Sequence, residues 1–119
     1  MATIKSYTDL GQSQALAEIL PIESADYHYI VQGEKSYFYS YSLSSDAIKD
    51  YDEEIKYIPC WSLAALLKLL PKSAQLKKGN VTELYRVTLP VELKTSNWYI
   101  DPIDACYEFT LKLHELNLL

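Results

Sequence analysis

Glycine, proline and cysteine are all scarce in this sequence. Three glycines and five prolines among 119 residues argue against long disordered linkers. The length suits one domain, which we expect to span residues 1–119 and to fold without a disulfide or a metal. Cys60 and Cys106 lie far apart in the chain. We expect both to be reduced thiols.

Long hydrophobic runs are missing as well. No stretch approaches the roughly 18 apolar residues of a membrane-spanning helix. The opening residues, Met-Ala-Thr-Ile-Lys-Ser-Tyr, contain no apolar core of the kind that a signal peptide needs. The sequence therefore predicts a cytoplasmic protein without a membrane partner.

Positive charge is in short supply, with 11 Lys plus Arg against 16 Asp plus Glu and a net charge of −5. Duplex-binding domains normally carry a basic face, because their affinity comes largely from displacing phosphate counterions. We therefore predict no nucleic-acid partner, and binding through lysines is the least favoured function. The basic cluster contains no arginine and is interpreted as a solubilising loop; it comprises Lys68, Lys72, Lys77 and Lys78.

Recognisable catalytic and ligand-binding motifs are absent. The sequence has no Walker loop, no dinucleotide-binding glycine pattern and no G-x-S-x-G. Its histidines, His28 and His114, and its two cysteines show no metal-ligand spacing. The acidic segment 46–54 lacks the central glycine of an EF-hand loop, so we interpret it as a solvated loop. We predict no cofactor, no metal and no small-molecule ligand.

One cysteine supports an alternative function. Cys60 directly precedes a helix pattern, and a helix dipole can lower the pKa of a thiol. The alternative is therefore a thiol enzyme or small hydrolase-like enzyme that uses Cys60. Free cysteines are more often small buried side chains, and Cys106 lies on the expected core face of a helix. We therefore favour a protein without enzymatic activity.

Tyrosine is what the sequence has in abundance: seven of its 11 tyrosines lie between residues 27 and 57. Gly33-Glu34 predicts a type II′ turn between strands at 27–32 and 35–42. In this register one face of the hairpin carries His28, Ile30, Tyr37, Tyr39 and Tyr41. The opposite face carries Tyr27, Tyr29, Val31 and Phe38. We expect helices to cover one face and leave the other half exposed.

Three helix patterns and a second hairpin complete the predicted fold. The helices start near Ser6 or Thr8, at Ser62 and at Asp101. Strands are expected at 84–89 and 98–100, joined by a turn at 94–97. Trp61 and Trp98 are interpreted as core anchors. The order α-β-β-α-β-β-α predicts an α+β fold in which an antiparallel sheet of two hairpins packs on helices.

The exposed hairpin face provides the predicted function. Tyrosine is enriched at the centres of protein interfaces, so Tyr37, Tyr39 and Tyr41 are our interface candidates. Tyrosine also favours strands for packing reasons alone, and its ring can stack on a small ligand. We predict a non-catalytic accessory or interaction module that binds a protein partner or a second copy of itself.

Three segments of the chain resemble segments of a known group of proteins. They are the opening Thr8 to Leu16 with Gln12-Ser13, the segment Ile58-Pro59-Cys60-Trp61-Ser62-Leu63-Ala64-Ala65-Leu66-Leu67, and the ending Asp101-Pro102-Ile103-Asp104-Ala105-Cys106 through Leu116. Together they resemble a group of small uncharacterised proteins from Bacteroides-type gut bacteria and their prophages or mobile elements. The resemblance implies a bacterial cytosolic setting and transfers no activity, cofactor or site residue.

Overall fold

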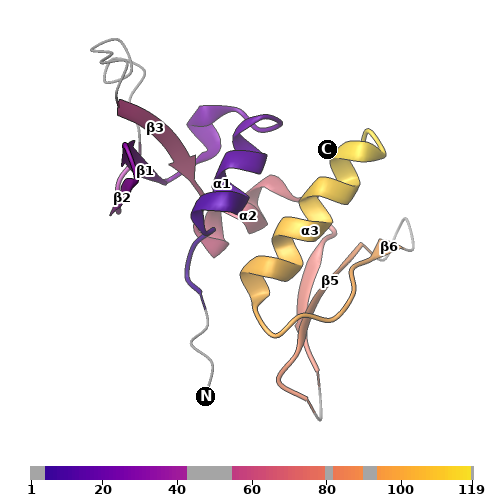
Figure 1. Cartoon of the computed structure of the whole chain (residues 1–119). Coiled ribbons are helices and arrows are strands. Elements are labelled where there is room, and N and C mark those ends of the chain that lie inside the picture. The colour runs from indigo at the N-terminus through magenta and orange to yellow at the C-terminus, as the bar shows by residue number, and fades with distance from the viewer. Residues whose placement is uncertain (1–4, 43–54, 80–81, 90–93, 119) are drawn as a thin grey trace.

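The computed structural model describes residues 5–42, 55–79, 82–89 and 94–118 (Figure 1). Helices and antiparallel strands are both present, so the predicted α+β class is confirmed. The elements in chain order are α1 (Leu10–Ala17), the 3-10 turn η1 (Ile22–Ser24), β1 (Tyr27–Gln32), β2 (Lys35–Tyr39), β3 (Ile55–Cys60), α2 (Leu63–Leu69), β4 (Gln75–Lys78), β5 (Tyr85–Leu89), β6 (Lys94–Thr95) and α3 (Pro102–Glu115).

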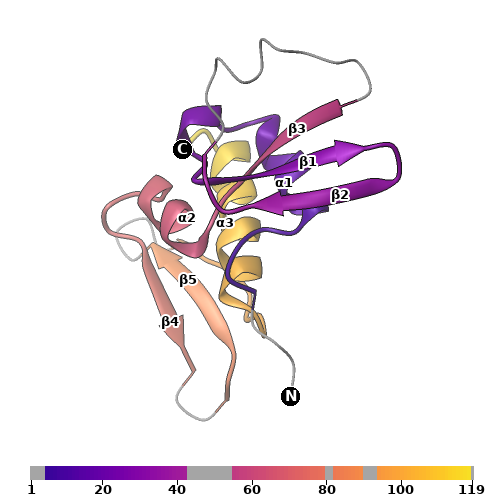
Figure 2. The same cartoon turned by 90° about the vertical axis from the view of Figure 1, so that its left-hand side faces the viewer.

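The strands form two sheets instead of one. The first sheet has the order β2-β1-β3 and the second has the order β4-β5-β6, and every pairing is antiparallel. Figures 1 and 2 show the two sheets at opposite ends of the molecule, with the helices between them. Helix α1 packs on β3, α2 packs on α3, and α3 packs on β5.

The first hairpin forms with the predicted turn and register. Gly33 has a φ of 61°, whereas Glu34 has no positive φ, which is the pattern of a type II′ turn. Gln32 pairs with Lys35 across this turn. His28 accordingly lies opposite Tyr39. The alternation of side chains then fixes which residues share each face.

Strand β3 was not expected. It pairs with the free side of β1 and follows the acidic segment 46–54, which lies outside the described residues. Pro59 within it argues against a central strand, because proline has no N–H for the ladder. Since β3 lies at the edge of the sheet, the missing donor is tolerated.

The second sheet also differs from the predicted hairpin. Lys77 and Lys78 belong to strand β4, not to a loop. The returning strand β6 lies at 94–95, where a turn was expected, and Tyr99 makes only an isolated bridge with Tyr85. The Ser96 hydroxyl accepts a hydrogen bond from the Val87 N–H at 2.9 Å. The Ser96 N–H still donates to the Val87 carbonyl at 2.8 Å, but a side-chain oxygen takes the place of the backbone acceptor for the Val87 N–H, so the regular ladder ends there.

Side-chain caps begin all three α-helices. Asp9, not Ser6 or Thr8, caps α1: its carboxylate accepts from the Gln12 N–H at 2.8 Å, and the Gln12 side chain accepts from the Asp9 N–H. This reciprocal pair is a capping box. Ser62 caps α2 and Asp101 caps α3, as predicted.

The main core lies between the three helices and the second sheet. It is built from apolar side chains of α1, α2, α3 and β5 together with Trp61. A separate small core under the first sheet contains Tyr29, Ile58 and Cys60. Leu67 of α2 and Leu116 at the end of α3 are exposed and do not belong to this core. Among the described residues, no helix has both the length and the apolar character required to cross a membrane.

Candidate functional site

The two faces of the first sheet have different surroundings. On one face, Phe38 stacks on Tyr7 with ring centroids 3.9 Å apart, and Tyr27 meets both rings edge-on. The Tyr29 hydroxyl donates to the Thr8 carbonyl at 2.9 Å. The segment that leads into α1 therefore covers this face and closes the small core.

The opposite face is the tyrosine face, which we define as Ile30, Tyr37, Tyr39, Tyr41 and Tyr57. The structure brings the three predicted interface residues together on it, since Tyr39 and Tyr41 contact each other and Tyr37 lies beside Ile30. Tyr37 is 45% exposed and Tyr41 is 61% exposed. Among the described residues, one face is thus covered and the other half exposed, but the cover comes from the segment before α1 as well as from α1, whereas helices alone were expected.

The sequence reading missed Tyr57, which strand β3 brings to the tyrosine face. It lies opposite Ile30 and therefore on the same side of the sheet. The alternation of Ile55, Tyr57 and Pro59 was the available signal for this strand.

His28 forms the floor of the tyrosine face and is buried. Its ring stacks on Tyr39 at 5.1 Å and meets Tyr41 edge-on at 4.8 Å. Its Nδ1 lies 2.7 Å from the Tyr41 carbonyl oxygen. Because a carbonyl only accepts, Nδ1 carries the proton of this hydrogen bond. The histidine thus fixes two tyrosines in place and is held as a packing residue.

Cys60 lies on the other side of the same sheet and has no histidine beside it. It pairs with Tyr27 in the ladder, whereas His28 pairs with Pro59, so the thiol and the imidazole point to opposite faces. The thiol is fully buried and donates to the Thr8 carbonyl at 3.3 Å. Burial raises the pKa of the Cys60 thiol, which opposes the thiolate that a nucleophile requires.

Cys106 is no better suited to chemistry. It is buried in the main core on α3, and burial raises its pKa to about 12. Among the described residues, no group of three His, Cys, Asp or Glu side chains is placed to hold a metal ion.

The two tryptophans have different environments. Trp61 is a core anchor, as predicted: it is fully buried and its indole N–H donates to the Ser24 hydroxyl at 2.9 Å. Trp98 is 41% exposed, so its interpretation as a core anchor is wrong. It lies beside β5 on the outer side of the second sheet, against Arg86.

Comparison of this chain with protein-family models, with curated proteins and with solved structures finds no match. The resemblance to small proteins of Bacteroides-type bacteria stays a prediction from the sequence.

Proposed function

We propose that this protein is a non-catalytic interaction module that binds protein through the tyrosine face. The observation that carries the proposal is the exposure of Tyr37 and Tyr41 on a sheet face that no described helix covers. Tyrosine gives an interface a large rigid contact area, and its hydroxyl both donates and accepts hydrogen bonds. His28 and the cross-strand contacts hold these rings in place before binding, which reduces the entropy lost on association.

The partner to which we commit is a second copy of the chain. None of the five residues of the tyrosine face carries a formal charge at neutral pH. Local repulsion between two copies is then limited to Lys35, which shares this side of β2 with Tyr37 and Tyr39. Hydroxyl groups that donate and accept also suit a two-fold interface, in which one patch meets its own copy. The whole chain carries −5, and salt screens that longer-range repulsion.

The alternative thiol enzyme finds less support. A catalytic cysteine needs access to substrate and a nearby base or positive field. Cys60 is fully buried, its pKa is raised and His28 projects to the opposite face. Two buried, unbridged cysteines also support a reducing compartment, and we propose the bacterial cytoplasm.

Sedimentation velocity of the full chain across micromolar to millimolar concentrations, in about 150 mM salt, tests the proposal. We expect a concentration-dependent dimer. Tyr41→Ser should weaken it by roughly tenfold or more, because a truncated tyrosine anchor commonly costs above about 1 kcal/mol of binding energy. A chain that stays monomeric throughout would contradict the proposal.

Leu67→Ser is the matched control. Leu67 is 38% exposed on α2 and does not belong to the tyrosine face, so its loss removes apolar surface elsewhere. If Leu67→Ser dissociated the dimer as strongly as Tyr41→Ser, the tyrosine face would not be the interface.

A further inference from the structure

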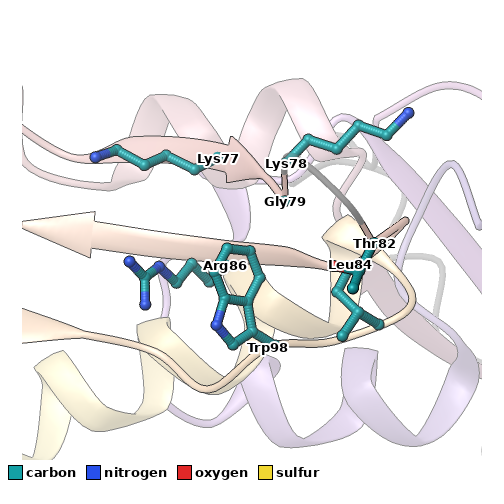
Figure 3. A pocket seen from close by; sticks show the side chains of 7 residues that line it. All are labelled: Lys77, Lys78, Gly79, Thr82, Leu84, Arg86 and Trp98. Carbon is teal, nitrogen blue, oxygen red and sulfur yellow. The ribbon is translucent and has the colours of Figure 1, made fainter.

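A hollow of about 630 Å³ opens on the second sheet (Figure 3). This sheet lies at the opposite end of the molecule from the first sheet (Figure 1). Strands β4 and β5 and the segment that contains Trp98 surround it. Figure 3 shows Lys77 and Arg86 extending the same way from neighbouring strands, with the Trp98 ring beside Arg86. Lys78 extends the opposite way from Lys77, and Thr82 and Leu84 also line the hollow.

Charge in this region is segregated from the rest of the chain. Residues 68–89 hold five of the 11 basic residues and one of the 16 acidic residues, so they carry +4 and the remainder carries −9. The sequence reading saw lysines alone, whereas the fold adds Arg86 to them. A local cationic patch on an acidic protein provides a directed attraction for an anion.

Two cations of the hollow lie close enough to repel each other. Lys77 and Arg86 are direct cross-strand partners, and like charges in that position destabilise a sheet. Among the described residues, both ion pairs belong to Lys5, so no carboxylate neutralises this pair. The Arg86 Nε is also buried, and it has no hydrogen-bond partner among the described residues. A bound anion would relieve the repulsion of these two side chains.

An aromatic ring accompanies the charge. The Arg86 guanidinium carbon lies 4.4 Å from the centroid of the Trp98 ring, within the range of a cation–π contact. The contact holds the guanidinium in place, which favours phosphate over a less demanding anion. The exposed part of Trp98 is a flat surface against which another ring can stack.

We propose that this hollow binds a nucleotide unit, with its phosphate on Lys77 and Arg86 and its base against Trp98. The unit is either a free nucleotide or part of a single strand, and the phosphate-plus-ring chemistry is common to both. A carboxylate-rich peptide would satisfy the charges and leave the ring unused.

Fluorescence anisotropy of a dye-labelled thymidine oligonucleotide of about eight residues tests this with the full chain. We expect saturable binding that weakens as salt rises, because counterions are released. Trp98→Leu should reduce affinity by roughly tenfold through lost stacking. Lys77→Gln should reduce both the affinity and the steepness of the salt dependence.

Lys35→Gln removes the same charge from β2 on the first sheet and should leave binding unchanged. Circular dichroism checks that each variant folds. If Trp98→Leu does not fold, Lys77→Gln still tests the site. Competition with unlabelled thymidine monophosphate and with unlabelled oligonucleotide separates the two sources. Equal competition by the two identifies a free nucleotide as the ligand. Competition by the oligonucleotide alone identifies a single strand.

Three results would overturn the proposal. The first is no saturable binding of either nucleotide form. The second is unchanged affinity in folded Trp98→Leu or Lys77→Gln. The third is competition by inorganic phosphate or a polyglutamate peptide as strong as that by the nucleotide, since then the ring contributes nothing.

Discussion

The two sheets share one plan and differ in what they present outward. Each has three antiparallel strands, one face on a core and the other turned away. Outward from the first sheet lie uncharged tyrosines, and outward from the second lie Lys77 and Arg86 beside Trp98. The inner faces carry the buried side chains of the two cores. In both of our proposals, the binding surface is formed by the alternate residues that the cores leave free.

The cores beneath the two sheets also differ in size. The main core receives side chains from three helices and β5, whereas the small core has three buried residues. Burial of apolar surface is the dominant favourable contribution to folding. The second sheet should consequently be anchored more firmly than the first.

Phe109→Ala is expected to produce the largest effect. Phe109 is almost fully buried in the main core, and such truncations cost about 3–5 kcal/mol. The free energy of unfolding from urea titration measures it. Amide exchange of the unmodified chain tests the comparison itself: if the second sheet exchanged faster than the first, the firmer anchoring of the second sheet would be refuted.

Ser62→Ala should cost about 1–2 kcal/mol. The Ser62 hydroxyl caps α2 by accepting from the Ala65 N–H at 3.2 Å, and it donates to Asp26 next to β1. Ser62 thus connects the end of the first sheet to a helix of the main core. Urea titration checks the value, and Ser36→Ala on exposed β2 is the control that should change little. Equal effects of the two changes would mean that this connection contributes no stability.

Tyr29→Phe tests the small core alone and should cost about 1 kcal/mol. It removes the hydrogen bond to the Thr8 carbonyl, which still accepts from Cys60. The matched change Tyr27→Phe removes a hydroxyl from the same face and should be nearly neutral. Thermal unfolding compares the two variants, and a larger loss for Tyr27→Phe would refute the assignment.

Lys5→Met should cost about 0.5–1 kcal/mol at neutral pH. Lys5 joins the segment over the first sheet to α3, with its Nζ 2.6 Å from Asp104. Partial burial lowers the pKa of Lys5, but its contacts with Asp104 and Asp9 outweigh that and raise it above 10.5. The contribution is therefore complete below pH 10.5 and disappears as the pH rises through the folded-state pKa. Urea titrations of both proteins at neutral and alkaline pH measure it; a gap that widens with pH would contradict this.

Tyr41→Ser should have the smallest effect on stability, within about 0.5 kcal/mol in the monomer. The side chain is mostly exposed, and the Tyr41 carbonyl that His28 contacts remains. Unfolding at concentrations below dimer formation measures this. A loss comparable with that of Ser62→Ala would assign Tyr41 to the fold and not to recognition.

The sequence predicted best what local chemistry decides. Gly33 fixes the turn, and a known turn fixes the register that puts Tyr37, Tyr39 and Tyr41 on one face. The caps at Ser62 and Asp101 follow from residue type and the periodic pattern after them. These contacts span a few residues, so a single sequence contains the information.

Features that depend on pairing between strands far apart in the sequence could not be predicted from local patterns. Tyr57 joins the tyrosine face only because β3 crosses back to pair with β1 across the acidic segment. Arg86 meets Lys77 only through the register of β4 and β5. The run of lysines was interpreted as a loop, but lysines are common in edge strands, and β4 lies at an edge.

The contrast between Trp61 and Trp98 gives this chain two independent optical reporters. The wavelength of indole emission shifts with the polarity around the ring. Trp61 is fully buried in the main core, whereas Trp98 is partly exposed to solvent and contacts the Arg86 guanidinium. Emission from Trp61 therefore follows the integrity of the molecule, and emission from Trp98 follows events at a single surface. Replacing either indole in turn leaves a chain that signals one process without the other.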